Sequence, residues 1–249
     1  MRRFFASVLV ALAASGPAHA APPLITEDTG TQGKGAFQLE VTIEQARQSR
    51  SGTSYDGTET SVVLNYGVAE DIDLQFIVPY LHLTEETAAG RTVTKGVLDA
   101  YLNLKWRFYE RDTLSFAVLP SLIVPTGAAG LSSERVNPGA RLIASYEPGA
   151  FAVHADGGYR NFDNVQGLRE HLYHLSAAMM YTLHDTLKLV ADQSGETSPD
   201  PASSNSVRYT TLGAIWIFSP GVGIGCGVKM GHGDQAIERS YLCGVGMRQ

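Results

Sequence analysis

The residues best suited to nucleophilic chemistry are His174 and Ser176, which stand two positions apart in the stretch HLYHLS. A serine becomes a nucleophile when a histidine takes its proton and a third group orients that histidine. Some membrane-embedded lipid hydrolases carry such a pair on one strand. Here Tyr173 and Leu175 predict a lipid-facing side, which turns His174 and Ser176 away from lipid. No other part of a hydrolase signature is present, so we predict no catalytic residues and no enzyme.

Metal and phosphate sites are not indicated either. His171 and His174 lie on opposite faces of a strand and cannot share one ion. The stretch GVGIGCGVKMGHG lacks the Gly-Lys-Ser/Thr ending and the following helix of a phosphate loop. Its alternate glycines, Gly223, Gly225 and Gly227, are expected to face inward and leave space for another segment or a bulky neighbour. We predict neither a metal nor a cofactor.

Charged and amide side chains form the most extensive candidate site. They recur on the polar face of strand-like segments whose other face is apolar, so they would line the lumen of a barrel. Mutual pairing that fills the interior is the favoured interpretation, and a charged constriction that selects solutes is the other. The candidate lumen residues are Glu59, Asp99, Asn103, Lys105, Arg107, Arg141, His154, Asp156, Arg160 and His174.

Strands must position these residues, because a two-residue alternation dominates the chain. In VLDAYLNLKWRFYE, one face carries Leu102, Leu104 and Trp106, and the other carries Asn103 and Lys105. Similar patterns predict twelve strands, near residues 35–49, 58–68, 71–83, 96–109, 113–125, 138–147, 151–161, 169–183, 186–194, 207–218, 221–231 and 237–247. Tight connections such as GVAED and FSPG alternate with longer ones such as SRSGTSYDG and TEETAAGRTVTK. We therefore predict an all-β fold, a transmembrane antiparallel up-and-down β-barrel of about 12 strands spanning residues 35–249.

Composition supports export to an outer membrane. Residues 1–20 have a basic start, the apolar core FFASVLVALAA and the small-residue site AHA, which predict a signal peptide. Glycine is frequent, at 26 of 249 residues, and charged residues make up 18%, below the roughly 25% of soluble domains. The formal net charge of −6 argues against a nucleic-acid partner. We expect the outer membrane of a Gram-negative type of envelope, with outer-membrane lipid and the barrel assembly machinery as partners.

Two further features leave alternatives open. A turn centred on GDQA would place Cys226 opposite Cys243 on the lipid-facing side. The two cysteines would form a disulfide there or remain two small lipid-facing residues. The polar segment of residues 21–34 would fold into the lumen as a plug through Glu27, Asp28, Thr29 and Gln32, or remain a periplasmic tail. Glu27 and Asp28 would pair with Lys105, Arg107 or Arg141 in the plug.

The opening PLITEDTGTQGKGAFQLEV resembles the start of the family named MetA-pathway of phenol degradation. The stretches IDLQFIVPY, GVLDAYLNLKWRFYE and LPSLIVPTG follow in the order of that family. The likeness covers most of the chain and is strongest over residues 23–125. One departure is the ending CGVGMRQ, which lacks the terminal aromatic residue that the assembly machinery reads and puts Met247 near that place.

The resemblance implies an outer-membrane transporter for small hydrophobic or aromatic solutes. From it we expect a channel that works by passive diffusion, without covalent chemistry. The alternative is a closed structural or interaction barrel without transport activity.

Overall fold

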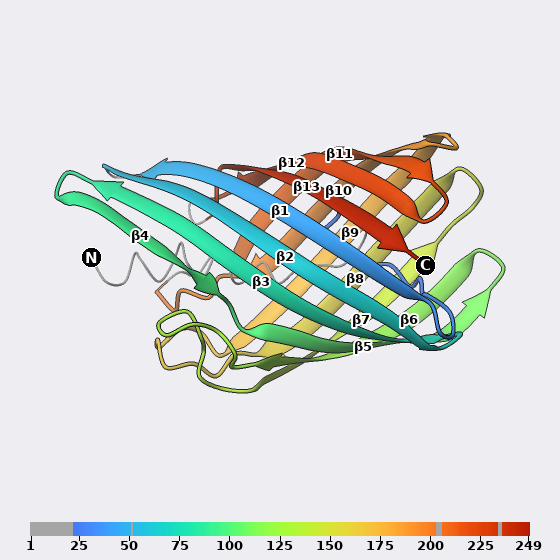
Figure 1. Cartoon of the computed structure of the whole chain (residues 1–249), viewed down its shortest axis with the longest axis horizontal. Helices are drawn as coiled ribbons and strands as arrows, with labels where there is room; N and C mark the ends of the chain where they lie inside the picture. The colour runs from blue at the N-terminus through green and yellow to red at the C-terminus, as the bar shows by residue number, and fades with distance from the viewer. Residues whose placement is uncertain (1–21, 51, 203–205, 234–235) are drawn as a thin grey trace.

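The computed structural model describes residues 22–50, 52–202, 206–233 and 236–249. The predicted signal peptide of residues 1–20 lies outside this range. The described residues form thirteen strands, in one antiparallel sheet that curls into a barrel (Figure 1). The strands are β1 (Phe37–Arg50), β2 (Thr53–Ala69), β3 (Ile72–Thr87), β4 (Gly90–Val97), β5 (Ala100–Arg111), β6 (Leu114–Val124), β7 (Asn137–Tyr146), β8 (Phe151–Asn161), β9 (His171–His184), β10 (Leu187–Thr197), β11 (Ser206–Ser219), β12 (Val222–His232) and β13 (Arg239–Arg248).

The barrel has twelve positions because β4 and β5 occupy one of them. Both strands pair with β3. β4 pairs with residues 80–87 of β3, and β5 pairs with residues 72–77 of β3. β1 pairs with β2 on one side and with β13 on the other, which closes the ring. The predicted antiparallel barrel of twelve strands is therefore confirmed. No helix among the described residues is long and apolar enough to cross a membrane.

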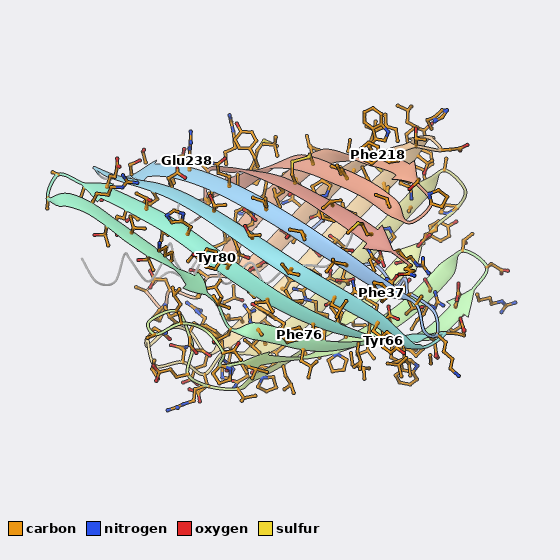
Figure 2. All side chains as sticks on the ribbon, in the orientation of Figure 1. Phe37, Tyr66, Phe76, Tyr80, Phe218 and Glu238 are labelled. Atoms are coloured by element: carbon orange, nitrogen blue, oxygen red, sulfur yellow. A yellow bond between two sulfur atoms is a disulfide. The ribbon has the colours of Figure 1, made fainter. Side chains whose placement is uncertain are left out.

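Alternation sorts the side chains as predicted. On β5, Leu102, Leu104 and Trp106 are exposed on the outside, whereas Asn103 and Lys105 are buried inside. Figure 2 shows Phe37, Tyr66 and Phe218 toward the end of the barrel that carries the tight turns. Exposed aromatic rings at that level form the girdle expected at a membrane interface. Six aromatic residues that lie next to the tight turns in the sequence are all exposed: Tyr66, Trp106, Phe108, Tyr181, Trp216 and Phe218.

The fourth predicted strand is interrupted, which the periodicity did not show. Leu98 and Asp99 break residues 96–109 into β4 and β5, and the Leu98 amide donates to the carbonyl of Pro79 at 2.9 Å. Leu98 turns inward and is buried, although its parity predicted a lipid-facing position. A bulge in the pairing of β5 with β6 likewise turns Tyr109 outward. Both errors arise because a break or bulge shifts the side-chain alternation by one residue.

Two of the predicted long connections are largely strand. β1 continues to Arg50 and β2 starts at Thr53, so the stretch SRSGTSYDG forms a tight hairpin. β3 continues to Thr87 and β4 starts at Gly90, which shortens the predicted loop TEETAAGRTVTK to another hairpin. These hairpins extend beyond the rest of the wall at one end of the barrel (Figure 1). Threonine and valine in these stretches favour pleated pairing over loop structure.

The last two strands have the register that the sequence predicted. Val222 pairs with Met247, and Cys226 pairs with Cys243. A disulfide joins Cys226 to Cys243, and both residues are exposed on the outer face. Met247 is also exposed on the outside, opposite Leu39 of β1.

Candidate solute pathway in the barrel lumen

The described part of the polar N-terminal segment, residues 22–34, lies inside the barrel against the inner faces of the strands. The amides of Ile25 and Thr26 donate to one oxygen of Asp192 on β10, at 2.9 and 2.7 Å. The amide of Glu27 donates to Asp156 on β8 at 2.7 Å. Buried carboxylates that accept backbone N–H groups satisfy both partners, so the segment is held by specific bonds.

Lys105 on β5 anchors the middle of the segment. Its Nζ lies 2.5 Å from Oε1 of Glu27, 3.7 Å from Oδ1 of Asp28 and 3.2 Å from the carbonyl oxygen of Gly30. Lys105 and Glu27 are almost completely buried. In this buried site, the three oxygen atoms take the place of the water that the ammonium group loses on burial.

The segment then follows the wall toward β1. The amide of Thr29 donates to Ser145 on β7 at 3.1 Å, and the amide of Gln32 donates to Asp73 on β3 at 2.9 Å. At Gly33 the chain passes so close to Gly67 that a Cβ atom on Gly67 would overlap the Gly33 carbonyl. The segment thus contacts successive strands before it enters β1.

Pro22 and Pro23, at the other end of the segment, rest on a glycine-lined wall. A Cβ atom on Gly225 would overlap the carbonyl oxygen of Pro22, and a Cβ atom on Gly227 would lie 2.8 Å from the Pro23 ring. Gly223, the third glycine of the predicted inward set, does not contact the prolines closely. The small inner face of β12 therefore makes room for the segment.

His174 and Ser176 belong to a polar cluster on β8, β9 and β10. The His174 Nε2 lies 3.1 Å from the Ser176 hydroxyl and 3.2 Å from Asp156. The Ser176 hydroxyl donates to Asp156 at 3.0 Å, and the His174 Nδ1 lies 3.5 Å from Glu196. Because the Ser176 proton goes to a carboxylate and not to the histidine, the hydroxyl is not arranged as a nucleophile.

The other predicted lumen residues have separate roles. Asp99 accepts from the Ser133 amide at 2.8 Å and from the Gly127 amide at 2.9 Å, so it anchors the connection between β6 and β7. Arg107 lies near the tight turns, 3.1 Å from Glu110. The contacts of the remaining residues are Asn103 with Gln75, His154 with Ser145, and Arg141 with Asp156, while Glu59 lies opposite Glu44, and Arg160 lies over the ring of Phe162.

Three inward-facing residues that make buried contacts in the lumen were not among the candidates predicted from the sequence. Asp192 holds the segment, Glu196 faces His174, and Lys229 pairs with Glu44 at 2.5 Å. Asp192 and Lys229 lie on the inward parity of predicted strands, so the alternation contained the signal that could have found them, whereas Glu196 lies beyond the end of the predicted strand 186–194. No group of three or more metal-ligating side chains occurs in the part of the chain that the structure describes.

Two clusters of buried apolar residues lie inside the barrel, on either side of the layer of polar lumen residues described above. One cluster, toward the long hairpins, contains Ile25, Ala46, Leu81, Leu83, Leu98, Val207, Tyr209, Ala236 and Ile237. The other contains Leu24, Ala178, Val190 and Ile215, with Met180 packed against it. Consecutive residues of the N-terminal segment, Leu24 and Ile25, therefore belong to different clusters. A cavity of about 320 Å³, lined by Leu24, Met180 and Ile215 among others, adjoins the second cluster.

A smaller cavity remains between the segment and the wall formed by β3 and by β5 to β10. It is lined by Glu27, Tyr101, Arg141, Arg160, His174 and Glu196 among others, and its volume is about 60 Å³. An apolar cavity of about 150 Å³ is known to admit benzene. The passage beside the segment is therefore too small for an aromatic ring in this conformation.

Solved structures with the same fold are outer-membrane barrels. The COG4313 outer membrane channel from Pseudomonas putida F1 has a TM-score of 0.72 at 14% identity, and the match covers 93% of this chain and all of that one. The NalP translocator domain from Neisseria meningitidis has a TM-score of 0.59 at 12% identity, covering 85% and 88%. The KdgM porin has a TM-score of 0.58 at 11% identity, covering 84% and 98%.

The comparison with curated proteins found no match. A family model described as "Putative MetA-pathway of phenol degradation" matches residues 22–248. This range includes the N-terminal segment as well as all thirteen strands. The resemblance inferred from the opening residues is thus confirmed, and the chain belongs to the family of the putative MetA-pathway of phenol degradation.

Proposed function

We propose that this protein is an outer-membrane channel through which small hydrophobic or aromatic solutes diffuse passively. One observation carries the proposal. Leu24 and Ile25, consecutive residues of the segment, pack in two different apolar clusters inside the barrel. The cavity of about 320 Å³ beside the second cluster is lined by Leu24, Met180 and Ile215 together with polar side chains such as Glu40 and Lys188, and it thus combines apolar surface with a few polar groups, as small-molecule sites do.

Similarity supports the proposal from a second direction. The Pseudomonas putida F1 protein is described as an outer membrane channel, and the family description refers to phenol degradation. The solved structures reported above are a channel, a translocator domain and a porin. We propose the same location for this protein, with the predicted signal peptide directing its export.

Passage requires the N-terminal segment to move. The cavity beside Glu27 is smaller than an aromatic ring needs, and Leu24 and Ile25 of the segment are packed into two apolar clusters inside the barrel. The segment is therefore the proposed plug, with Glu27, Asp28, Thr29 and Gln32 holding it. Hydrogen bonds to Asp73, Asp156 and Asp192 must break or rearrange when a solute passes.

The test is current through the refolded full chain in planar bilayers, with and without toluene. We expect toluene to block the current, and glycerol at the same concentration to leave it unchanged. The double variant Leu24→Asn/Ile25→Asn should lose the toluene block, whereas Thr31→Ala, at a half-buried position outside both apolar clusters, should keep it. A toluene effect equal to that of glycerol would contradict the proposed solute class.

The second candidate is a closed structural barrel. It is favoured by the buried bonds that hold the segment in the lumen, such as Lys105 with Glu27. A chain that carries no current with the segment in place, and none after its removal, would support this candidate.

A further inference from the structure

Three arginines and a histidine gather on the outer face of the barrel where the apolar band ends. They are Arg47 on β1, Arg239 on β13, His232 on β12 and Arg208 on β11, and all four are exposed. We call them the basic patch. The strands β1, β13, β12 and β11 are neighbours in that order, so the patch is continuous along the wall. The chain as a whole has a net charge of −6, so composition does not explain such a cluster.

Register brings these four residues together and sets two like charges, Arg47 and Arg239, directly opposite each other. Arg47 pairs directly with Arg239, and Arg208 pairs directly with His232. Arg239 also pairs with Met230, two residues before His232 on β12, which joins the two pairs into one group. Like charges directly opposite each other across strands are unfavourable unless an anion lies between them.

Two of the three arginines of the patch, Arg208 and Arg239, have no carboxylate partner among the described residues. Arg47 bonds to Asp56 on β2 at 2.9 Å, on the side away from Arg239. No carboxylate of the described residues lies within 4.0 Å of the guanidinium group of Arg208 or Arg239. The patch therefore carries unneutralised positive charge that an external anion would relieve.

The outer surface next to the patch is apolar, as the acyl chains of a membrane lipid require. Below the patch on the same strands lie exposed apolar side chains, Tyr241 on β13, Ile224 on β12 and Leu212 on β11. The patch stands at the end of these strands away from Phe218, whose girdle marks the tight-turn end (Figure 2). In the proposed orientation this is the level of the outer-leaflet headgroups.

We propose that the basic patch binds the phosphate groups of a phosphorylated glycolipid of the outer leaflet, whose acyl chains lie along the apolar side chains below. The planar guanidinium group of arginine binds phosphate oxygens through two parallel, charge-assisted hydrogen bonds. The proposal concerns the outside of the wall and is independent of what passes through the lumen.

The test uses the refolded full chain in detergent micelles with added diphosphorylated lipid A. The unfolding temperature is measured against lipid concentration, which yields an apparent Kd. We expect the lipid to stabilise the wild-type chain, and the Kd to rise about tenfold for each arginine lost in Arg208→Gln/Arg239→Gln. The matched control is Arg91→Gln/Arg111→Gln, two exposed arginines outside the patch, which should bind as the wild type does.

Two further probes identify the ligand. Lipid A stripped of its phosphates should bind much more weakly than the diphosphorylated form, and inorganic phosphate alone should give no comparable shift. Equal binding by the Arg208→Gln/Arg239→Gln variant and the wild type would overturn the proposal. An equal shift from inorganic phosphate would overturn the assignment to a lipid. Without lipid, the variant should unfold at a temperature no lower than that of the wild type and carry the same bilayer current, which excludes a folding defect.

Discussion

The ammonium group of Lys105 lies 2.5 Å from the carboxylate of Glu27, although 78 residues separate them in the chain. Only 8% of the Lys105 side chain and 2% of the Glu27 side chain are exposed. This ion pair joins the N-terminal segment to the wall of the barrel. Its burial makes either charge costly without the other.

Replacement of Lys105 by methionine should therefore destabilise the protein. A buried carboxylate left without its partner typically costs about 3–5 kcal/mol. The double variant Lys105→Met/Glu27→Gln should recover much of this loss, because it leaves no unpaired charge. Reversible urea unfolding from lipid vesicles measures the difference, and additive losses in the double variant would show that the two residues do not interact.

Deletion of residues 22–33 should raise single-channel conductance. The segment occupies the lumen through bonds to Asp192, Asp156 and Asp73, and without it this space fills with water. Planar-bilayer recording of the shortened chain beside the full chain measures the effect. Unchanged conductance would show that the segment does not limit the passage of ions.

Substitution of Gly225 by valine should loosen the start of the segment, because a side chain there would occupy the place of the Pro22 carbonyl. We expect larger current fluctuations in the same recordings. Gly246→Val is the matched control, since a Cβ atom on Gly246 would meet its nearest atoms at 3.6 Å, in ordinary contact. In the chain shortened by residues 22–33, Gly225→Val should have no further effect.

Loss of the disulfide should lower stability without altering the lumen. Cys226 and Cys243 close a loop of 17 residues on the outer face. A disulfide across such a loop contributes about 2–4 kcal/mol. Cys226→Ser/Cys243→Ser should therefore unfold at lower urea than the oxidised wild type. Wild type treated with a reducing agent should unfold as the double variant does, and equal stability of oxidised and reduced protein would contradict the prediction.

Replacement of Ser176 by alanine should leave ester hydrolysis at the background rate, for the variant and the wild type alike. The Ser176 hydroxyl donates to Asp156 and is not oriented to be activated by His174. Release of p-nitrophenol from short-chain esters measures this. Hydrolysis by the wild type that disappears in Ser176→Ala would instead identify a hydrolase in the lumen.

The sequence by itself determined the barrel and most of its register. Two-residue alternation decides which side chains meet lipid, because neighbours on a strand must point to opposite faces. The position of Cys226 opposite Cys243 follows from the turn between their strands alone. The charged lumen, including Lys105 and Asp156, follows from the same parity.

Only the tertiary structure decided where the alternation fails and which lumen residues meet. The break at Leu98 depends on the partner strands β3 and β6, not on any local pattern. The polarity of residues 22–34 is compatible with a plug or a tail. The choice depends on Asp192, Asp156, Lys105 and Asp73, which come from strands far apart in the chain. The Ser176 hydroxyl likewise has two acceptors within reach, and the pairing of β8 with β9, which sets Asp156 directly opposite Ser176, brings that carboxylate close enough to accept the hydrogen bond.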